Sequence, residues 1–271
     1  MQSHNIKIFN DTLQQLNTDK FLKESVKRSV EATEIILEDD KLADTQDRFT
    51  TPVEISISKL STCTAARLTH CYKTAILNFA SATRPGGGVL TGSKAQEECI
   101  CRQSTLYPSL ITDKAQKLFY ERHKAQHNAL NNNDIIYTPN VIIFKTDDYS
   151  TLQPFAQAKV DVITCAAPNL STVKLSSDKL LKLHESRAER ILSVAKSHEI
   201  DYLILGAFGC GVFMNDPLIV AEAYKNVINS KFLYAFKSIE FAIYTLTIPE
   251  MSHVQSMKNY DAFIKVFFNR E

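Results

Sequence analysis

The chain has 271 residues, of which 44% are apolar and 23% charged, so it is long enough to bury one large core or two small ones. Its 31 Lys and Arg against 30 Asp and Glu give a net charge of +1, which argues against bulk electrostatic binding of nucleic acid or of an anionic membrane. The first residues lack a basic region followed by an apolar run, and no stretch approaches the roughly 18 apolar residues of a membrane span.

The first 52 residues predict a helical extension. Residues 11–16 and 21–30 have helical patterns, and the charged segment 31–51 leads into the first strand. No internal repeat is present, and the short run at 131–133 indicates a loop. We therefore expect one domain over residues 1–271, in which residues 1–52 pack on the core.

From about residue 53, short β-branched runs alternate with longer helical periods, which is typical of a layered α/β sheet. Leu180, Ile191 and Ala195 recur near the helical period, and Asp216 before Pro217 indicates a helix start. The predicted strands are 53–58, 74–80, 141–145, 160–165, 202–205 and 239–245. The predicted helices are 113–127, 177–198, 216–230 and 253–268.

The cysteines and glycines are used unevenly. Six cysteines are scattered without a C-x-x-C pair in a chain too large to need disulfides, so we expect reduced thiols in the cytoplasm. Only 7 glycines occur, where average usage would give about 19. All of them lie within residues 86–92 and 206–211. A sequence that avoids glycine elsewhere requires it in these two segments.

The second glycine segment leaves the strand 202–205, turns through three glycines and enters the helix that begins at Asp216. This order predicts an anion-binding turn, because backbone N–H groups converge in such a loop and the helix N-terminus favours phosphate. The spacing G-x-x-G-x-G fits neither a dinucleotide fingerprint nor a P-loop. A tight structural turn is the alternative interpretation.

Two side chains in this second segment have open roles. Phe213 would stack on a ribose or nucleobase, or pack in the core. Cys210 has no histidine nearby in the sequence, so we do not expect it to be a nucleophile.

The first glycine segment follows a strand that ends near Ala80 and precedes a predicted helix that carries Gln96, Glu97 and Glu98. Consecutive glycines allow the backbone to approach a ligand closely. A carboxylate pair behind such a turn can bind sugar hydroxyls and protonate a leaving oxygen. The alternative is that the two glutamates only complement the helix dipole.

Other polar clusters carry less weight. His123 and His127 lie four residues apart, but Lys124 stands where a zinc protease needs Glu, so we expect a surface helix and no metal site. Asp147 and Asp148 are predicted turn residues. The segment 165–169 closes a central strand with small residues, either toward a ligand or as a plain turn.

The motifs resemble those of a known family. Gly86-Gly87-Gly88, seven residues, then Gln96-Glu97-Glu98 resembles the G-G-G-x(6-8)-Q-E-E signature of the macrodomain poly(ADP-ribose) glycohydrolases. Residues 206–213 are similar to the family's diphosphate loop, and residues 78–80 to the strand end that faces the distal ribose. Residues 102–107 resemble the microbial branch. The resemblance extends over about residues 53–250.

This resemblance implies a macrodomain-like three-layer α/β/α sandwich with a mixed central sheet and an N-terminal helical extension. It also implies a cleft for ADP-ribose and hydrolysis of the ribose–ribose bond of poly(ADP-ribose) from the chain end, with no metal or redox cofactor. Glu98 would be the catalytic acid and Glu97 its partner at the ribose. The implied substrate-binding residues are Asn78, Gly86, Gly87, Gly88, Gln96, Gly206, Ala207, Phe208, Gly209, Cys210, Gly211, Val212 and Phe213.

The acid role has an electrostatic requirement. A helix N-terminus lowers a glutamate pKa, whereas an acid at neutral pH needs a raised one. Burial and repulsion between Glu97 and Glu98 would have to supply the rise.

Two other functions remain open in the sequence: release of single ADP-ribose units from a protein or nucleobase, and binding of ADP-ribose without cleavage. The intact Gln96-Glu97-Glu98 favours an enzyme, since a binding module would not need it. In either hydrolase the partner is ADP-ribose or an ADP-ribosylated protein. The extension 1–52 matches no motif, so cleavage at the chain end or within the chain stays undecided.

Overall fold

The computed structural model describes residues 2–43, 45–69, 72–245 and 251–269, and Cys71 lies outside them. Within this part of the chain, seven strands form one sheet in the order β1-β4-β5-β3-β6-β7-β2. The strands are β1 (Glu34–Ile36), β2 (Glu54–Ser58), β3 (Thr74–Phe79), β4 (Ile135–Ile143), β5 (Ala158–Cys165), β6 (Tyr202–Leu205) and β7 (Ser238–Ala242).

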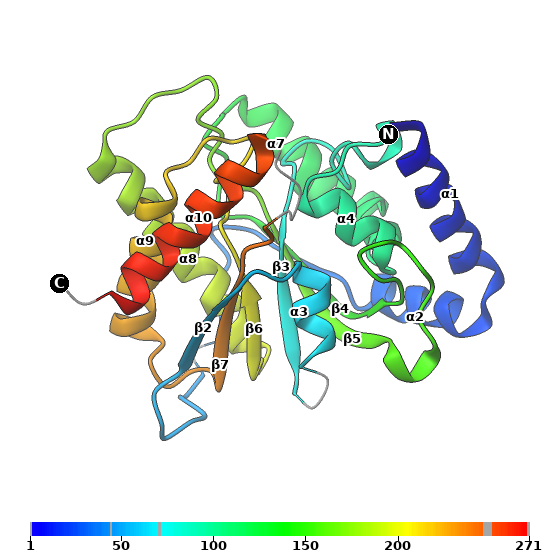
Figure 1. Ribbon diagram of the computed structural model, residues 1–271, viewed down its shortest axis with the longest axis horizontal. Helices are drawn as coiled ribbons and strands as arrows, with labels where there is room; N and C mark the ends of the chain where they lie inside the picture. The colour runs from blue at the N-terminus through cyan, green and yellow to red at the C-terminus, as the bar shows by residue number, and fades with distance from the viewer. Residues whose placement is uncertain (1, 44, 70–71, 246–250, 270–271) are drawn as a thin grey trace.

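The sheet is mixed, as the resemblance implied. Strands β2, β7, β6, β3 and β5 run parallel to one another. Strand β4 pairs antiparallel with β5, and β1 pairs antiparallel with β4, so β4 runs opposite to the other six of these strands. The carboxyl ends of β3 and β5 are level, because Phe79 pairs with Cys165. Parallel neighbours end at the same edge of a sheet, so the loops after β3, β5 and β6 meet there, at the top of Figure 1.

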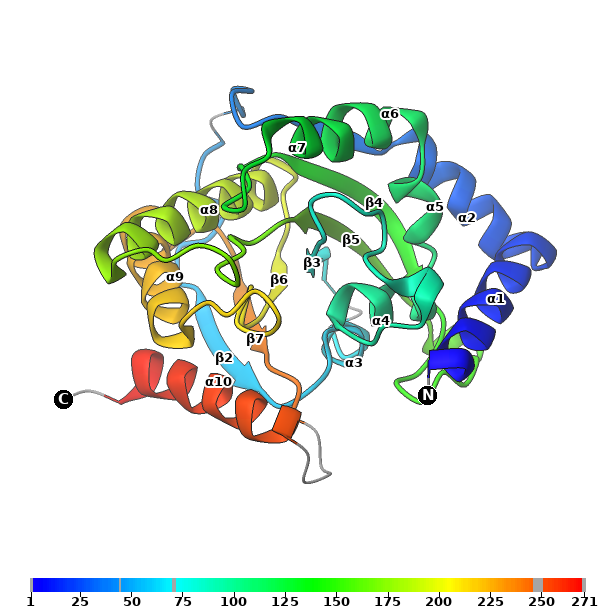
Figure 2. The same ribbon diagram turned by 90° about the horizontal axis from the view of Figure 1, so that it is seen from above.

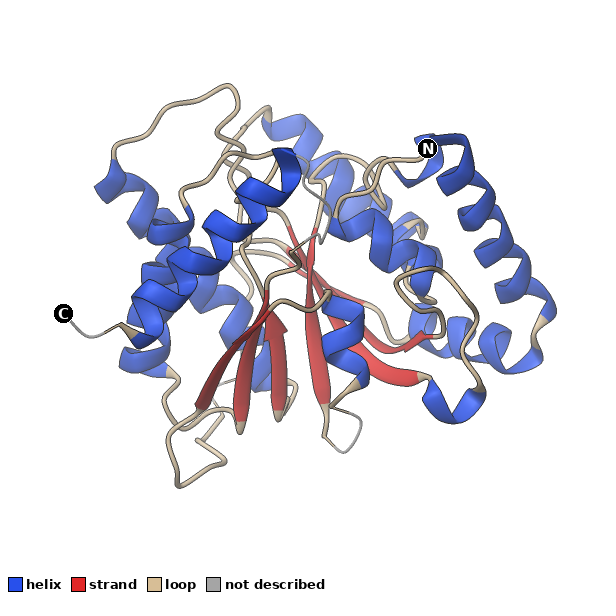
Figure 3. Ribbon diagram, viewed as in Figure 1, coloured by secondary structure: helices blue, strands red, loops and turns tan. Residues whose placement is uncertain are grey.

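Helices cover both faces of the sheet (Figures 2 and 3), which confirms the three-layer α/β/α fold. One face carries α8 (Ser177–Ser197), α9 (Pro217–Lys231) and α10 (Met251–Phe268). The other carries the remaining helical elements: α1 (Gln2–Thr18), α2 (Lys20–Glu31), α3 (Thr62–Arg67), η1 (Val89–Thr91), α4 (Gln96–Gln103), α5 (Tyr107–Leu110), α6 (Asp113–Ala115), η2 (Gln116–Tyr120) and α7 (Glu121–Gln126). The short turn η3 (Pro154–Ala156) precedes β5.

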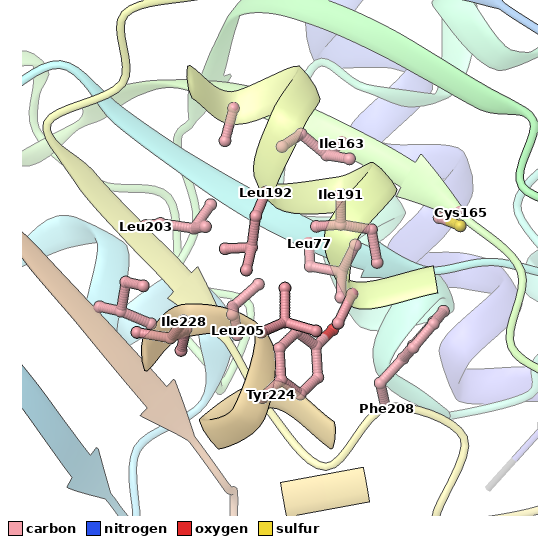
Figure 4. Close-up of a cluster of buried hydrophobic side chains, with 14 of the residues drawn as sticks. Leu77, Ile163, Cys165, Ile191, Leu192, Leu203, Leu205, Phe208, Tyr224 and Ile228 are labelled. Carbon is pink, nitrogen blue, oxygen red and sulfur yellow. The ribbon is translucent and has the colours of Figure 1, made fainter. Parts of the chain in front are cut away.

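The central strand β3 divides its side chains between two apolar cores. Leu77 joins the core under α8 and α9, where Leu192 and Tyr224 pack (Figure 4). Ile76, one residue earlier, joins the core on the α4 side. Because side chains alternate along a strand, Asn78 is directed to the α4 side as well. The polar side chain of Asn78 therefore lies on the face of β3 that α4 covers.

The N-terminal helices pack on the α4 side through both apolar and polar contacts. Phe9 is fully buried and meets the Tyr107 ring edge-on, with ring centroids 4.9 Å apart. The buried Lys145 Nζ donates to Asp11 Oδ2 at 2.7 Å and to Thr12 Oγ1 at 2.8 Å. Whether residues 1–271 behave as one cooperative domain stays a prediction.

Most predicted elements agree with the structure, and the differences have local causes. Strand β6 has the predicted bounds, whereas β1 was missed because it is three residues long within a charged segment. The first half of β4 was missed because Pro139 and a register shift between Thr138 and Val141 interrupt its pattern. The helix predicted at 113–127 is divided into α6, η2 and α7.

None of the helices in the described residues combines the length and the apolar character needed to cross a membrane.

Phe9→Ala tests how firmly the extension belongs to the core. Deleting a fully buried phenylalanine should lower the free energy of unfolding by about 3 to 5 kcal/mol. Phe21→Ala is the matched control, because Phe21 is 54% exposed and should cost less than about 0.5 kcal/mol. Urea unfolding of the full chain measures both. An unchanged main transition in Phe9→Ala would show that the extension folds separately from the core.

Candidate active site

The site lies where the loops after β3, β5 and β6 meet. The loop after β3 holds the triple glycine, the loop after β5 is residues 166–169, and the loop after β6 is residues 206–213. Polar contacts tie the last two together, because Leu170 N donates to Phe213 O at 2.9 Å. The two glycine segments, more than 110 residues apart in sequence, are thus brought to one edge of the sheet.

The two glutamates converge on Gly87. A methyl group at Gly87 would overlap Glu98 Oε1 and lie 2.9 Å from Glu97 Oε2, and the φ angle there is +59°. Only glycine meets both conditions, since other residues rarely adopt that backbone angle and have no room for a Cβ. The triple glycine therefore wraps its backbone around the carboxylates.

Glu98 has one bonded oxygen and one unbonded oxygen. Its side chain is 6% exposed, and Oε1 accepts a hydrogen bond from Gly88 N at 2.7 Å. Oε2 is buried and has no hydrogen-bond partner. Buried polar atoms are almost always paired, so an unpaired carboxylate oxygen beside a glycine turn points to a ligand or a proton as its partner.

Glu97 is held more completely by the protein. Its Oε2 accepts from Ser81 N at 2.8 Å, and its Oε1 faces Asn78 Nδ2 at 3.4 Å. Burial and, to a smaller extent, the neighbouring charge of Glu98 raise the pKa of Glu97 to about 8, against the opposing effect of the Ser81 and Asn78 hydrogen bonds. The rise in pKa that the acid role requires is thus found on Glu97 of the pair. Glu97 is therefore mainly protonated at neutral pH.

Asn78 reaches this pair from β3. It is fully buried, and its Nδ2 also lies 3.2 Å from Thr164 Oγ1 on β5. Its Oδ1 is buried without a partner, which adds a second unpaired acceptor close to the glutamates.

Gln96 ties α4 to β3. Its Oε1 accepts from Phe79 N at 2.8 Å, and its Nε2 donates to Leu77 O at 2.7 Å and to Thr62 Oγ1 at 3.1 Å. These contacts use its amide on the protein itself. The geometry therefore favours a positioning role for Gln96, while its predicted contact with substrate stays a prediction.

The loop 206–213 turns some side chains into the core and leaves others open. Phe208 and Cys210 are each 1% exposed, and their N–H groups donate to Gly206 O and Ala207 O within the loop, so their predicted contact with substrate stays a prediction. Burial raises the pKa of the Cys210 thiol well above its ordinary value, so it is unsuited to be a nucleophile, as expected. Val212 is 79% exposed, and Phe213 is half-buried against the core.

Asn215 and His184 support this loop from its buried side, and neither was predicted from the sequence. Asn215 Nδ2 donates to Gly209 O at 2.9 Å and to Pro168 O at 2.7 Å, which joins the loops after β6 and β5. His184 Nε2 lies 2.9 Å from Asn215 Oδ1 and fixes the amide. The sequence signal for each is a polar residue at a position where the helical or loop pattern expects a core residue. This signal does not by itself show that Asn215 and His184 bond each other.

The remaining candidates fall outside the site. His123 is 4% exposed and bonds Phe119 O through Nδ1, so the predicted surface position is wrong for it; apolar packing of η2 and α7 buries the ring. His127 is exposed and ends α7 with a left-handed backbone. Asp147 accepts from Ser61 and Thr64 near the start of α3. Among the described residues, no group of three or more His, Cys, Asp or Glu side chains is placed to hold a metal ion.

The layered sheet, the buried glutamate pair and the open glycine loop together define a macrodomain-type glycoside hydrolase. The family model for the microbial-type poly(ADP-ribose) glycohydrolase (PARG) catalytic domain matches residues 7–146. The chain therefore belongs to the microbial-type poly(ADP-ribose) glycohydrolases, which confirms the resemblance seen in the sequence. The match to the family model begins at residue 7. Most of the N-terminal extension 1–52, which matched no motif in the sequence, therefore lies within the family's catalytic domain.

Solved structures agree with this assignment. Poly(ADP-ribose) glycohydrolase from Thermomonospora curvata is 30% identical, with a TM-score of 0.85 over 98% of this chain and 100% of that one. The same enzyme bound to the inhibitor ADP-HPD is 29% identical, with a TM-score of 0.82 over the same shares. The enzyme from Deinococcus radiodurans in complex with ADP-ribose is 32% identical, with a TM-score of 0.77 over 90% of this chain and 97% of that one. No curated protein matches the chain.

His184 should make stability depend on pH. Burial lowers the pKa of His184 to about 4, whereas the unfolded chain binds the proton near pH 6.5. Its contribution to stability is therefore complete above pH 6.5 and is lost as the pH falls toward 4, by about 3 kcal/mol at most. Urea unfolding of the parent and of His184→Gln between pH 7 and 4 should show a steeper loss in the parent. Parallel pH curves would contradict the assignment.

Proposed function

We propose that Glu98 and Glu97 hydrolyse the ribose–ribose bond of poly(ADP-ribose) and release ADP-ribose from the chain end. The observation that carries this proposal is the buried pair that converges on Gly87, in which Glu97 has a raised pKa and Glu98 Oε2 lacks a partner. The Deinococcus radiodurans enzyme binds ADP-ribose, and its structure resembles this chain over 90% of the length.

In the proposed reaction the pair donates its proton to the oxygen of the departing ribose. The glycosidic C–O bond breaks through an oxocarbenium-like state, and a water molecule then adds to the anomeric carbon and returns a proton to the pair. Glu98 is the member that would reach the substrate, because its Oε2 is not held by the protein. Glu97, bonded to Ser81 and Asn78, would position the ribose and keep the pair protonated at neutral pH.

The loop after β6 would hold the diphosphate. The N–H groups of Gly211, Val212 and Phe213 are used in no hydrogen bond within the described residues, and three consecutive free donors suit a phosphate group. A methyl at Gly211 would meet no atom within 4 Å, so the fold itself does not require glycine there. Close approach of a ligand accounts for this glycine.

The proposal extends to the setting of the reaction. The described cysteines are all free, and Cys63, Cys101, Cys165 and Cys210 are buried, which fits a reducing compartment such as the cytoplasm. The substrate would there be polymer carried by a modified protein. The net charge of +1 argues against a role for bulk nucleic-acid binding.

Product analysis tests the function directly. Protein carrying labelled poly(ADP-ribose), and separately protein carrying single units, is incubated with the chain. Early release of monomeric ADP-ribose from the polymer supports the proposal. Oligomers as the first product would replace the chain-end assignment, and release only from singly modified protein would replace the substrate.

Glu98→Gln should separate catalysis from binding. Glutamine keeps the volume and a polar end but cannot transfer a proton, so turnover should fall by at least about 10²-fold. ADP-ribose binding, measured by calorimetry, should persist within about threefold of the parent. Glu97→Gln should also reduce turnover, by weaker positioning of the ribose. Parent-level turnover in Glu98→Gln together with loss in Glu97→Gln would reverse the two roles.

Gly211→Ala should separate ligand binding from folding. The added methyl has open space in the protein, so the melting temperature should change by less than about 2 °C, while ADP-ribose affinity should fall at least about tenfold. Gly209→Ala is the contrasting variant, because its methyl would lie 2.6 Å from Asn215 Nδ2 and 2.7 Å from Ala167 Cβ at a φ of +77°. That variant should lose stability as well as affinity. Unchanged affinity in Gly211→Ala would remove the diphosphate assignment.

A further inference from the structure

Arg102 is a buried cation without a carboxylate partner. Its side chain is fully buried on α4, one helical turn after Glu98. Nη1 donates to Ser93 O at 2.7 Å, Nε to the Tyr149 hydroxyl at 3.1 Å, and Nη2 to Cys99 Sγ at 3.6 Å. None of the ion pairs among the described residues includes it. A permanent charge is thus held in the interior by a carbonyl, a hydroxyl and a sulfur atom.

Such an arrangement is costly, because a guanidinium stays protonated and loses its hydration on burial. An apolar side chain of similar length would fill the same space without that cost. A structural role alone therefore accounts poorly for arginine at this position. Because the side chain has no exposed surface, direct contact with substrate does not account for it either.

The contacts of Arg102 lead back to the catalytic pair through the glycine turn. Arg102 binds the carbonyl of Ser93, and Ser93 N donates to Gly88 O at 3.1 Å, which closes the turn. Gly88 N in turn holds Glu98 Oε1 at 2.7 Å. A methyl at Gly88 would overlap Ser93 Oγ, so the two residues are in close contact. Arg102 and Glu98, both on α4, thus form hydrogen bonds with the backbone of the same turn.

We propose that Arg102 is a positioning residue, which fixes the Gly88–Ser93 turn so that the Gly88 N–H orients the Glu98 carboxylate. The proposal rests on the catalytic role of Glu98 given above. The turn includes two glycines, Gly88 and Gly92, so its backbone depends on external restraints to keep a single geometry. Asn5 Nδ2 from α1 holds Gly92 O, and Arg102 Nη1 holds Ser93 O. Anchoring at Ser93 by the same helix that carries Glu98 supplies one of these restraints.

Arginine suits this task better than lysine. Each of the three guanidinium nitrogens donates to a different acceptor, and the group is planar, so the side chain has a single orientation. A lysine ammonium would keep the charge but could not span Ser93 O and the Tyr149 hydroxyl with fixed geometry. Tyr149 also places its ring 5.3 Å from the guanidinium carbon, which adds a cation–π contact.

The test compares Arg102→Lys with Lys145→Met. Lys145 is an equally buried cation that bonds Asp11 and Thr12. Thr12 also donates to the backbone carbonyl of Arg102, but within the described residues Lys145 has no hydrogen bond to the Arg102 guanidinium, Ser93 or the glutamates. Tyr149→Phe removes only the hydroxyl that accepts from Arg102 Nε, and it serves if Arg102→Lys does not fold. For each full-length variant, melting temperature, kcat and KM on poly(ADP-ribose), and amide hydrogen exchange of residues 86–93 are measured.

Arg102→Lys should lower kcat at least about tenfold, change KM less than about threefold, and speed exchange of the Gly88 amide at least about tenfold. Tyr149→Phe should give the same pattern at a smaller size. Lys145→Met should lower the melting temperature while kcat and Gly88 exchange stay at parent values. Parent-level Gly88 exchange in both Arg102→Lys and Tyr149→Phe, or equal kcat losses in Arg102→Lys and Lys145→Met, would overturn the proposal. A parent chain without turnover would instead reject the proposed function, and Gly88 exchange would still decide the role of Arg102.

Discussion

Two carboxyl groups adjacent in sequence, both buried in the first turn of α4, set the conditions that the surrounding structure has to meet. Burial penalises a charge and like charges in a low dielectric repel, so burial together with the neighbouring Glu98 raises the pKa of Glu97 to about 8. The backbone N–H groups of Ser81 and Gly88 donate to Glu97 Oε2 and to Glu98 Oε1. Those donors reach the carboxylates only because Gly87 has no Cβ. Strand β3, the glycine turn and α4 are therefore arranged so that two neighbouring carboxyl groups can be buried together.

Around the glutamate pair, buried polar side chains hold the loops that would contact the substrate. Gln96 binds α4 to the backbone of β3, and Asn215 binds the loop after β6 to the loop after β5. Each uses nearly all its hydrogen-bonding capacity on main-chain groups, which are the atoms that set loop geometry. Rigid loops cost less to order when a ligand binds. Preorganisation in this site thus comes mainly from amide side chains that bind the backbone of the loops.

The N-terminal helices take part in this support. Helix α1 reaches the glycine turn directly, since Asn5 Nδ2 donates to Gly92 O at 2.8 Å and Thr12 Oγ1 donates to Arg102 O at 2.7 Å. A methyl at Gly92 would overlap the backbone at Gln2. One of the seven glycines, Gly92, therefore serves helix packing, although it lies in the same sequence segment as the predicted substrate-binding glycines 86–88.

The sequence by itself determined the alternation of strands and helices, the two glycine segments and the glutamate pair. Each of these features depends on residues that are adjacent in the chain and on short-range backbone preferences. The sequence pattern predicted β6 within its bounds and missed β1 and half of β4, where a short edge strand and a bulge leave no clear period. Tertiary structure alone decided that Asn215, His184 and Arg102 stand behind the loops. It also decided which glutamate has the raised pKa and which keeps an unpaired oxygen. Burial and hydrogen bonding depend on residues far apart in the chain, and no local pattern encodes them.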